Sequence, residues 1–125
     1  MKRIHNPNGV PAVYSDGIEI APGARTLYVA GQVGIAADKT IPDDIGSQTR
    51  QLFANLEAVL RSARMSLDDI VKTTVFIVDP ADYAEFSRVR TEIMGARVPA
   101  STLVYVKQLI WPQLRVEIEA IASAP

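Results

Sequence analysis

The sequence has no cysteine and only one histidine, His5, in 125 residues. Disulfide bonds, thiolate metal ligands and a cysteine nucleophile are therefore excluded. His5 lies near the N-terminus next to Asn6 and Pro7, and histidine-based catalysis or metal binding requires partner residues. No second histidine is present to supply one, so we expect His5 to be a solvated loop residue.

A strong excess of charge and long apolar runs are also missing. The 13 basic and 14 acidic residues leave a net charge of −1 and a pI of about 5.8, which gives no general attraction to nucleic acid or to an anionic membrane. No apolar run approaches the roughly 18 residues of a membrane span, and the N-terminus lacks the apolar core of a signal peptide. We expect a cytoplasmic protein with one domain over residues 1–125.

Hydrophobic periodicity and turn residues predict the order β-β-α-β-α-β-β. Residues 1–16 contain Pro7, Gly9 and Pro11 and are interpreted as an irregular arm. The predicted elements are strands at Gly17–Ile20 and Thr26–Val33, a helix at Asp43–Arg64, a strand at Val71–Val78, a helix at 80–94, a strand within 97–106 and a strand at Leu114–Ala122. The Pro22–Gly23 turn signal predicts that the first two strands form a hairpin.

The two β-α-β units predict an α+β fold, with one mixed sheet and both helices on the same face. The other face should then be polar if water covers it. Instead, Phe76 and Val78 lie on the side of their strand opposite Val75 and Ile77. We infer a homo-oligomer in which sheets pack on one another. The alternative is a monomer whose strands are apolar on both sides only because of β-propensity.

Two carboxylates on the last strand are candidates for chemistry. Glu117 and Glu119 are two residues apart, so they share a strand face at a spacing of roughly 7 Å. On a face buried by oligomerisation, unpaired carboxylates would be costly. In the structural interpretation each pairs with a Lys or Arg across the sheet or across the subunit interface. In the functional one, a carboxylate holds a water or a substrate amine in a cleft between subunits.

The glycine-containing stretch 29–36, "VAGQVGIA", is a weak phosphate site because a loop follows it where a phosphate cradle needs a helix N-terminus. It is better interpreted as a strand end where the backbone comes close to a ligand or to a neighbouring chain. The sequence contains no GxSxG, GxxxxGK[ST], HExxH or GxGxxG motif.

Four stretches taken in order resemble the RidA (YjgF) family: "VAGQVG", "DIVKTTVFIVDPADYAEF", "VPAST" and "RVEIEAIA". The resemblance covers nearly the whole chain. It implies a chorismate-mutase-like fold and a homotrimer whose sheets form an inner barrel. It also implies three intersubunit clefts that bind a small molecule, and an imine or enamine deaminase activity that needs neither metal nor cofactor.

The resemblance also implies roles for individual residues. It assigns Glu117 the catalytic role of positioning water. The residues that it implies for substrate binding are Tyr14, Gly31, Gln32, Ser87, Ser101 and Thr102. Two of these positions depart from the family pattern, because Ser101 stands where the family has a carboxylate-binding arginine and Ser87 where many members have asparagine.

The serine at position 101 has a physical cost for binding a carboxylate. Arginine offers a rigid two-pronged donor and serine one hydroxyl, so the loss costs about 2–5 kcal/mol in a desolvated cleft. Arg97 lies four residues earlier, about 13 Å along an extended chain, and can hardly reach the same spot within one subunit. Whether Arg88, Arg90 or a neighbour's Arg97 takes its place is left open.

Three functions are therefore open. The first is a deaminase whose substrate lacks the usual carboxylate or is anchored differently. The second is a trimer that binds a small metabolite or regulates a partner without catalysis. An endoribonuclease or translation inhibitor is less favoured, because the pI is low and the sequence has no basic stripe with aromatic residues.

Overall fold

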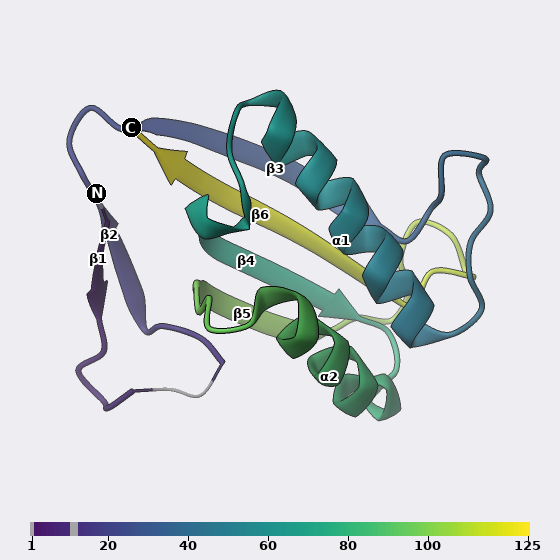
Figure 1. Cartoon of the computed structure of the whole chain (residues 1–125). Helices are drawn as coiled ribbons and strands as arrows, with labels where there is room; N and C mark the ends of the chain where they lie inside the picture. The colour runs from purple at the N-terminus through teal and green to yellow at the C-terminus, as the bar shows by residue number, and fades with distance from the viewer. Residues whose placement is uncertain (1, 11–12) are drawn as a thin grey trace.

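The computed structural model describes residues 2–10 and 13–125, and it has a four-stranded mixed sheet with two helices on one face (Figure 1). The strand order is β3 (Arg25–Val33), β6 (Val116–Ala124), β4 (Ile70–Ile77) and β5 (Ala100–Tyr105), and the helices are α1 (Ile45–Ser62) and α2 (Tyr83–Met94). The β4–β5 pair is parallel, whereas β6 is antiparallel to both β3 and β4. The predicted α+β fold is confirmed.

The N-terminal region differs from the prediction in two ways. Lys2–His5 forms strand β1, so this part of the expected irregular arm is a strand, and His5 lies on it, exposed and 3.0 Å from Glu19. Strand β2 (Gly17–Ile20) pairs with β1 and not with β3, so the predicted hairpin is wrong. All four β1 residues are exposed. Their sequence therefore carries no hydrophobic alternation that could reveal the strand.

Polar residues and a glycine set the helix ends. The Asp44 carboxylate accepts a hydrogen bond from the Ser47 N–H at 2.8 Å, which caps the start of α1. Two short 3₁₀ turns, Leu67–Asp69 and Pro80–Asp82, precede β4 and α2. Gly95 has a φ of 59° at the end of α2, a backbone conformation that favours glycine and stops the helix where the sequence predicts.

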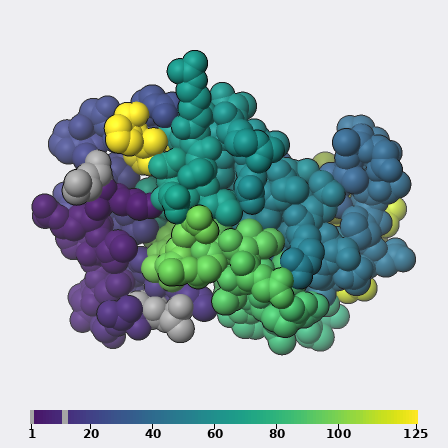
Figure 2. All heavy atoms as spheres, viewed as in Figure 1, coloured from purple at the N-terminus to yellow at the C-terminus, as the bar shows by residue number. Residues whose placement is uncertain are grey.

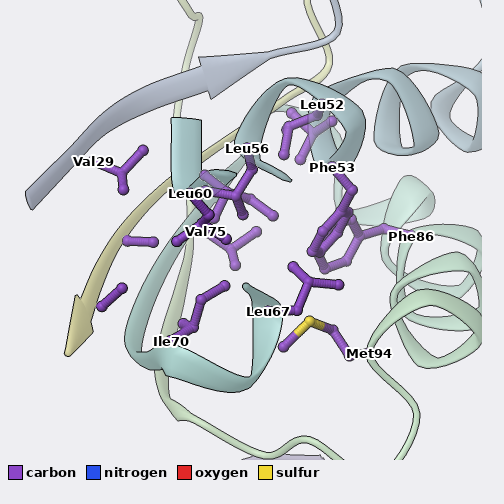
Figure 3. Close-up of a cluster of buried hydrophobic side chains, with 14 of the residues drawn as sticks. Val29, Leu52, Phe53, Leu56, Leu60, Leu67, Ile70, Val75, Phe86 and Met94 are labelled. Atoms are coloured by element: carbon purple, nitrogen blue, oxygen red, sulfur yellow. The ribbon is translucent and has the colours of Figure 1, made fainter. Parts of the chain in front are cut away.

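The core lies between the helices and the sheet. Leu52, Leu56 and Leu60 of α1 and Phe86 of α2 are fully buried, and Figure 3 shows them directed toward the side chains of β4. Figure 2 views this face, where the atoms of the two helices, in teal and green, cover the sheet. The apolar residues that recur along the two helices therefore form stripes that face the core.

The opposite face of the sheet is open in the single chain. Tyr28 of β3 is 76% exposed, and Val104 of β5 is also exposed. Phe76 and Ile121 are half-buried on the same face. The apolar character predicted for this face is present, and its burial by a second copy stays a prediction. Across residues 2–10 and 13–125, no helix is long and apolar enough to cross a membrane.

Candidate functional site

Glu117 lies on the open face of the sheet because it alternates with two core residues. Val116 and Ile118 point into the core on either side of it, and strand pairing sets Glu117 opposite Val33 on β3 and Phe76 on β4. Its side chain therefore belongs to the middle of the sheet, with paired strands on both sides.

The Glu117 carboxylate lies over the backbone of Gly31. A Cβ added at Gly31 would lie 1.7 Å from Oε2 of Glu117, a separation that no real pair of atoms adopts. The carboxylate thus occupies the space that a side chain at position 31 would fill. This is the close approach to the backbone that the glycine-containing strand suggested, and the neighbour is a side chain of the same subunit.

A β-bulge positions this part of β3. The register with β6 shifts between Val29 and Gln32, where β3 carries one extra residue. The Gln32 side-chain amide donates to the Ala30 carbonyl at 3.0 Å and so bridges the bulge. Bulges often lie next to active sites because they redirect backbone and side chains. The structure therefore brings two predicted site residues, Gly31 and Glu117, into direct contact, and Gln32 holds the bulge beside them.

The electrostatics of Glu117 suit a proton acceptor. Partial burial raises its pKa above the ordinary glutamate value because the charged form loses solvation, and the negative charge of Glu119 raises it further. Within the described ranges, neither Glu117 nor Glu119 has a Lys, Arg or His within ion-pair distance. The expected pairing with a cation is therefore not found across the sheet within the described part of one chain, and pairing across an interface stays a prediction.

The other predicted site residues lie elsewhere. Thr102 also faces the open side, where its hydroxyl accepts a hydrogen bond from the Lys72 ammonium at 2.7 Å. Ser101 belongs to the helix-facing side, where Thr73 donates to its Oγ at 2.9 Å. The sheet therefore separates Ser101 from Glu117 within a single chain.

Two further predicted residues lie near the β5 edge or on a helix. Tyr14 is exposed and directly precedes Ser15, whose N–H donates to the Pro99 carbonyl at 3.1 Å, so Tyr14 is held near the start of β5. Ser87 is on α2, where its Oγ is 3.4 Å from the Arg90 guanidinium. One chain thus holds the predicted residues in separate groups.

Sequence reasoning missed a pocket on the helix side of the sheet. It lies between α2, β4 and β5 and has a volume of about 50 Å³. Ser101 lines it together with Thr73, Arg90 and Met94. Position 90 borders the apolar stripe of α2, which is the only sequence signal for a pocket at this place. Within residues 2–10 and 13–125, no group of three or more acidic or histidine side chains is arranged to hold a metal ion.

Comparison with known proteins identifies the family. The family model described as endoribonuclease L-PSP matches residues 6–124. A solved Rid-family protein of Yersinia pestis superposes with a TM-score of 0.85 and 32% sequence identity over 98% of both chains. This chain belongs to the RidA (YjgF) family. The resemblance seen in the four sequence stretches is thereby confirmed.

Two curated relatives from the RidA family differ in the fraction of their length that aligns with this chain. The mouse 2-iminobutanoate/2-iminopropanoate deaminase is 31% identical over 112 residues, which are 87% of this chain and 79% of the mouse protein. The mitochondrial protein mmf1 of Schizosaccharomyces pombe is 40% identical over 98 residues, 77% of this chain. The match spans 60% of the length of mmf1.

Proposed function

We propose that the protein is a cofactor-independent imine or enamine deaminase in which Glu117 activates the attacking water. The observation that carries the proposal is the Glu117 carboxylate, which lies over Gly31, has a raised pKa and has no cationic partner among residues 2–10 and 13–125. A carboxylate in this state retains basicity that an ion pair would remove. A relative in the same family is named as a 2-iminobutanoate/2-iminopropanoate deaminase.

The proposed reaction is hydrolysis of a carbon–nitrogen double bond. Water adds through its oxygen to the imine carbon, and Glu117 takes the proton that the water loses. Glu117 returns this proton to the nitrogen, and the hydroxyl proton of the addition product follows it, so the nitrogen leaves as ammonia when its remaining bond to carbon breaks and a carbon–oxygen double bond forms. Glu117 must be ionised to accept the proton, and a raised pKa makes it a stronger base once it is ionised.

A neighbouring subunit would complete the proposed site. Tyr14, Ser87 and Ser101 lie away from Glu117 in one chain, so a cleft between subunits is required for them to contact the same molecule. The apolar open sheet face supports a homotrimer with the sheets inside. Gly31, Gln32 and Thr102 are proposed to complete substrate binding, and a cytoplasmic location stays a prediction.

Ammonia release from short-lived imines tests the proposal. An amino-acid dehydratase generates 2-iminopropanoate in the assay, and an imine without a carboxylate is tested in parallel. We expect Glu117→Gln to lower the accelerated rate about 10²- to 10⁴-fold, the usual contribution of a general base. Glu57→Gln on α1 is the control and should retain the full rate. Equal rates for the unmodified protein and Glu117→Gln on every imine would contradict the proposal.

The second candidate is a trimer that binds a small metabolite without turnover. Ser101 favours it, because a hydroxyl at this position replaces the charged donor that the family resemblance predicts. Ligand binding without accelerated hydrolysis would support this alternative. Endoribonuclease activity, which the family description names, has less support from this chain. Binding of single-stranded RNA that weakens with added salt would support endoribonuclease activity.

A further inference from the structure

Two amide side chains of α1 bind the backbone of the strands that carry the candidate site. Gln48 and Asn55 are about two helical turns apart, so they share one face of α1. The helix packs over β3 and β6 on the side of the sheet opposite Glu117 (Figure 1). The sheet separates both side chains from a molecule on the open face, so any effect on the site must pass through the strands.

Asn55 holds the end of β3. Its side-chain amide donates to the Val33 carbonyl and to the Ile35 carbonyl, each at 2.9 Å. Its Oδ1 accepts a hydrogen bond from the Gln51 amide at 2.9 Å, which fixes the orientation of the Asn55 side chain. Strand pairing sets Val33 opposite Glu117. Asn55 therefore anchors the backbone that directly follows the β-bulge.

Gln48 holds the start of β6. Its side chain is fully buried, and its Oε1 accepts a hydrogen bond from the Arg115 N–H at 2.8 Å. Its Nε2 donates to the Pro42 carbonyl at 2.8 Å and to the Gln113 carbonyl at 2.9 Å. Arg115 lies two residues before Glu117. The hydrogen bonds of this buried amide go to backbone groups, so Gln48 fixes the point at which β6 enters the sheet.

Gly34 brings the end of β3 against α1. A Cβ at Gly34 would lie 2.7 Å from the backbone oxygen of Gln48, so strand and helix backbones are in contact there. The Ile35 N–H donates to the Val33 carbonyl at 2.9 Å, which closes a tight turn around Gly34. This turn is held between Gln48 and Asn55. One helix thus sets the position of the end of β3 relative to the start of β6.

We propose that Gln48 and Asn55 are positioning residues, which hold the Glu117 carboxylate over Gly31 from the opposite side of the sheet. Gly31 and Glu117 meet only while the two strands keep their offset at the bulge, and each amide fixes one of these strands. An error of about 1 Å in the placement of a reacting group can cost about 100-fold in rate. This inference rests on the proposed function for its effect on rate.

Ammonia release from 2-iminopropanoate measures that effect. Asn55→Ala removes both donors to the end of β3, and we expect it to lower kcat about 10- to 100-fold with a smaller change in KM. Thr49→Val is the matched control, because Thr49 is a buried polar residue of α1 whose hydroxyl donates to the Ile45 carbonyl of the same helix at 2.8 Å. It should retain the full rate. Each variant is assayed well below its unfolding temperature, so that lost stability does not count as lost rate.

Titration of the Glu117 carboxyl carbon by nuclear magnetic resonance reports its position without any turnover, and Glu117→Gln identifies the signal by removing it. Partial burial raises the pKa of Glu117 in the unmodified protein. In Asn55→Ala we expect this pKa to return toward its ordinary value as the carboxylate moves into water, and the Gly31 N–H signal to follow the titration less. Glu119 is present in every variant, so its charge does not explain a change. Thr49→Val should leave both signals unchanged.

Further variants keep the test decisive. Asn55→Ser carries one donor where asparagine has two, so it should lie between Asn55→Ala and the unmodified protein, and it covers the case in which Asn55→Ala does not fold. Gln48→Met removes the anchor of β6 and should lower the Glu117 pKa in the same way. The positioning role is overturned by an Asn55→Ala protein whose Glu117 pKa is unchanged, whatever its rate, or by an equal change in Thr49→Val. If Glu117→Gln leaves hydrolysis intact, the proposed function fails, and the titration alone then supports or overturns the positioning.

Discussion

The two faces of the central sheet are built from adjacent residues of the same strands, yet their environments differ. On the helix side, Val75 and Ile118 are almost completely buried in an apolar core. On the open side, Phe76 and Glu117, one position away on each strand, are half-buried and lie beside each other. A step of one residue thus moves a side chain from the core to the candidate site.

The difference shows where stability and reactivity come from in this molecule. The helix side gains free energy from close packing of apolar groups. The open side holds two neighbouring carboxylates at a cost that appears as the raised pKa of Glu117. The core that the helices form therefore offsets an arrangement that is unfavourable in itself but suited to proton transfer.

The largest expected change in the free energy of unfolding comes from matched truncations on β6. Ile118→Ala on the helix side should lower the free energy of unfolding by about 2–5 kcal/mol because it leaves a cavity in the core. Ile121→Ala on the open side should cost about 1 kcal/mol or less in the dissociated chain. Urea unfolding monitored by circular dichroism measures both.

The same pair of variants also tests the proposed trimer. If a second copy covers the open face, the cost of Ile121→Ala should depend on protein concentration, whereas that of Ile118→Ala should be seen at every concentration. Sedimentation at matched concentrations shows whether Ile121→Ala shifts the assembly toward monomers. If both variants lost the same stability at every protein concentration, the proposed difference between the two faces would be contradicted.

A smaller difference in the free energy of unfolding is expected between alanine substitutions of two glycines near the end of β3. A Cβ at Gly34 would lie 2.7–2.9 Å from Gln48, including its backbone, so Gly34→Ala should cost about 1–3 kcal/mol by forcing α1 away. A Cβ at Gly31 meets the mobile end of Glu117 instead. Gly31→Ala should leave stability within about 0.5 kcal/mol and displace the carboxylate.

The readouts for the glycine variants are therefore different. Thermal unfolding should report Gly34→Ala, and the rate of imine hydrolysis should report Gly31→Ala. A Gly31→Ala protein with full hydrolysis would mean that the position of Glu117 is not important for the reaction.

The smallest effect concerns the pH dependence of hydrolysis. Glu117 must be ionised to accept a proton, so the rate should fall with decreasing pH through its pKa, which lies above the ordinary value of 4.5. Glu119→Gln removes the neighbouring negative charge, so it should lower this pKa and move the fall in rate to lower pH. An unchanged profile of rate against pH would contradict the coupling of the two carboxylates.

The same raised pKa predicts a change in stability. A carboxyl whose pKa is higher in the folded protein favours folding fully below its unfolded value, and this contribution is lost as pH rises through the folded value. Glu117→Gln should therefore be slightly more stable than the unmodified protein at neutral pH and not at pH 4. Thermal unfolding at the two pH values measures the difference.

The sequence predicts the helix side of the sheet better than the rest of the molecule. The stripe containing Leu52, Leu56 and Leu60 repeats with the helical period because burial demands it. Strand β1 is exposed along its whole length, so no such demand shapes its sequence, and it was missed. Its attachment depends on pairing with β2 and on the Lys2 ammonium, which donates to the Asp68 carbonyl.

The candidate site was predictable only in part. Alternation along β6 is enough to place Glu117 opposite the core, but its contact with Gly31 depends on the β-bulge, a register shift that no local pattern reveals. On α2, Val89 and Arg90 are adjacent, and either fits the edge of the apolar stripe. The structure buries Val89 completely and leaves Arg90 half-buried at the pocket.

The contact between Gly31 and Glu117 also restricts the order in which this protein can change. A side chain at position 31 and a glutamate at position 117 claim the same volume, so a substitution at 31 is tolerated at the site only after position 117 has become shorter. The residues at positions 31 and 117 are therefore expected to change together in evolution. A descendant that keeps the glutamate carboxylate in this place keeps glycine at position 31, however freely the surrounding surface varies.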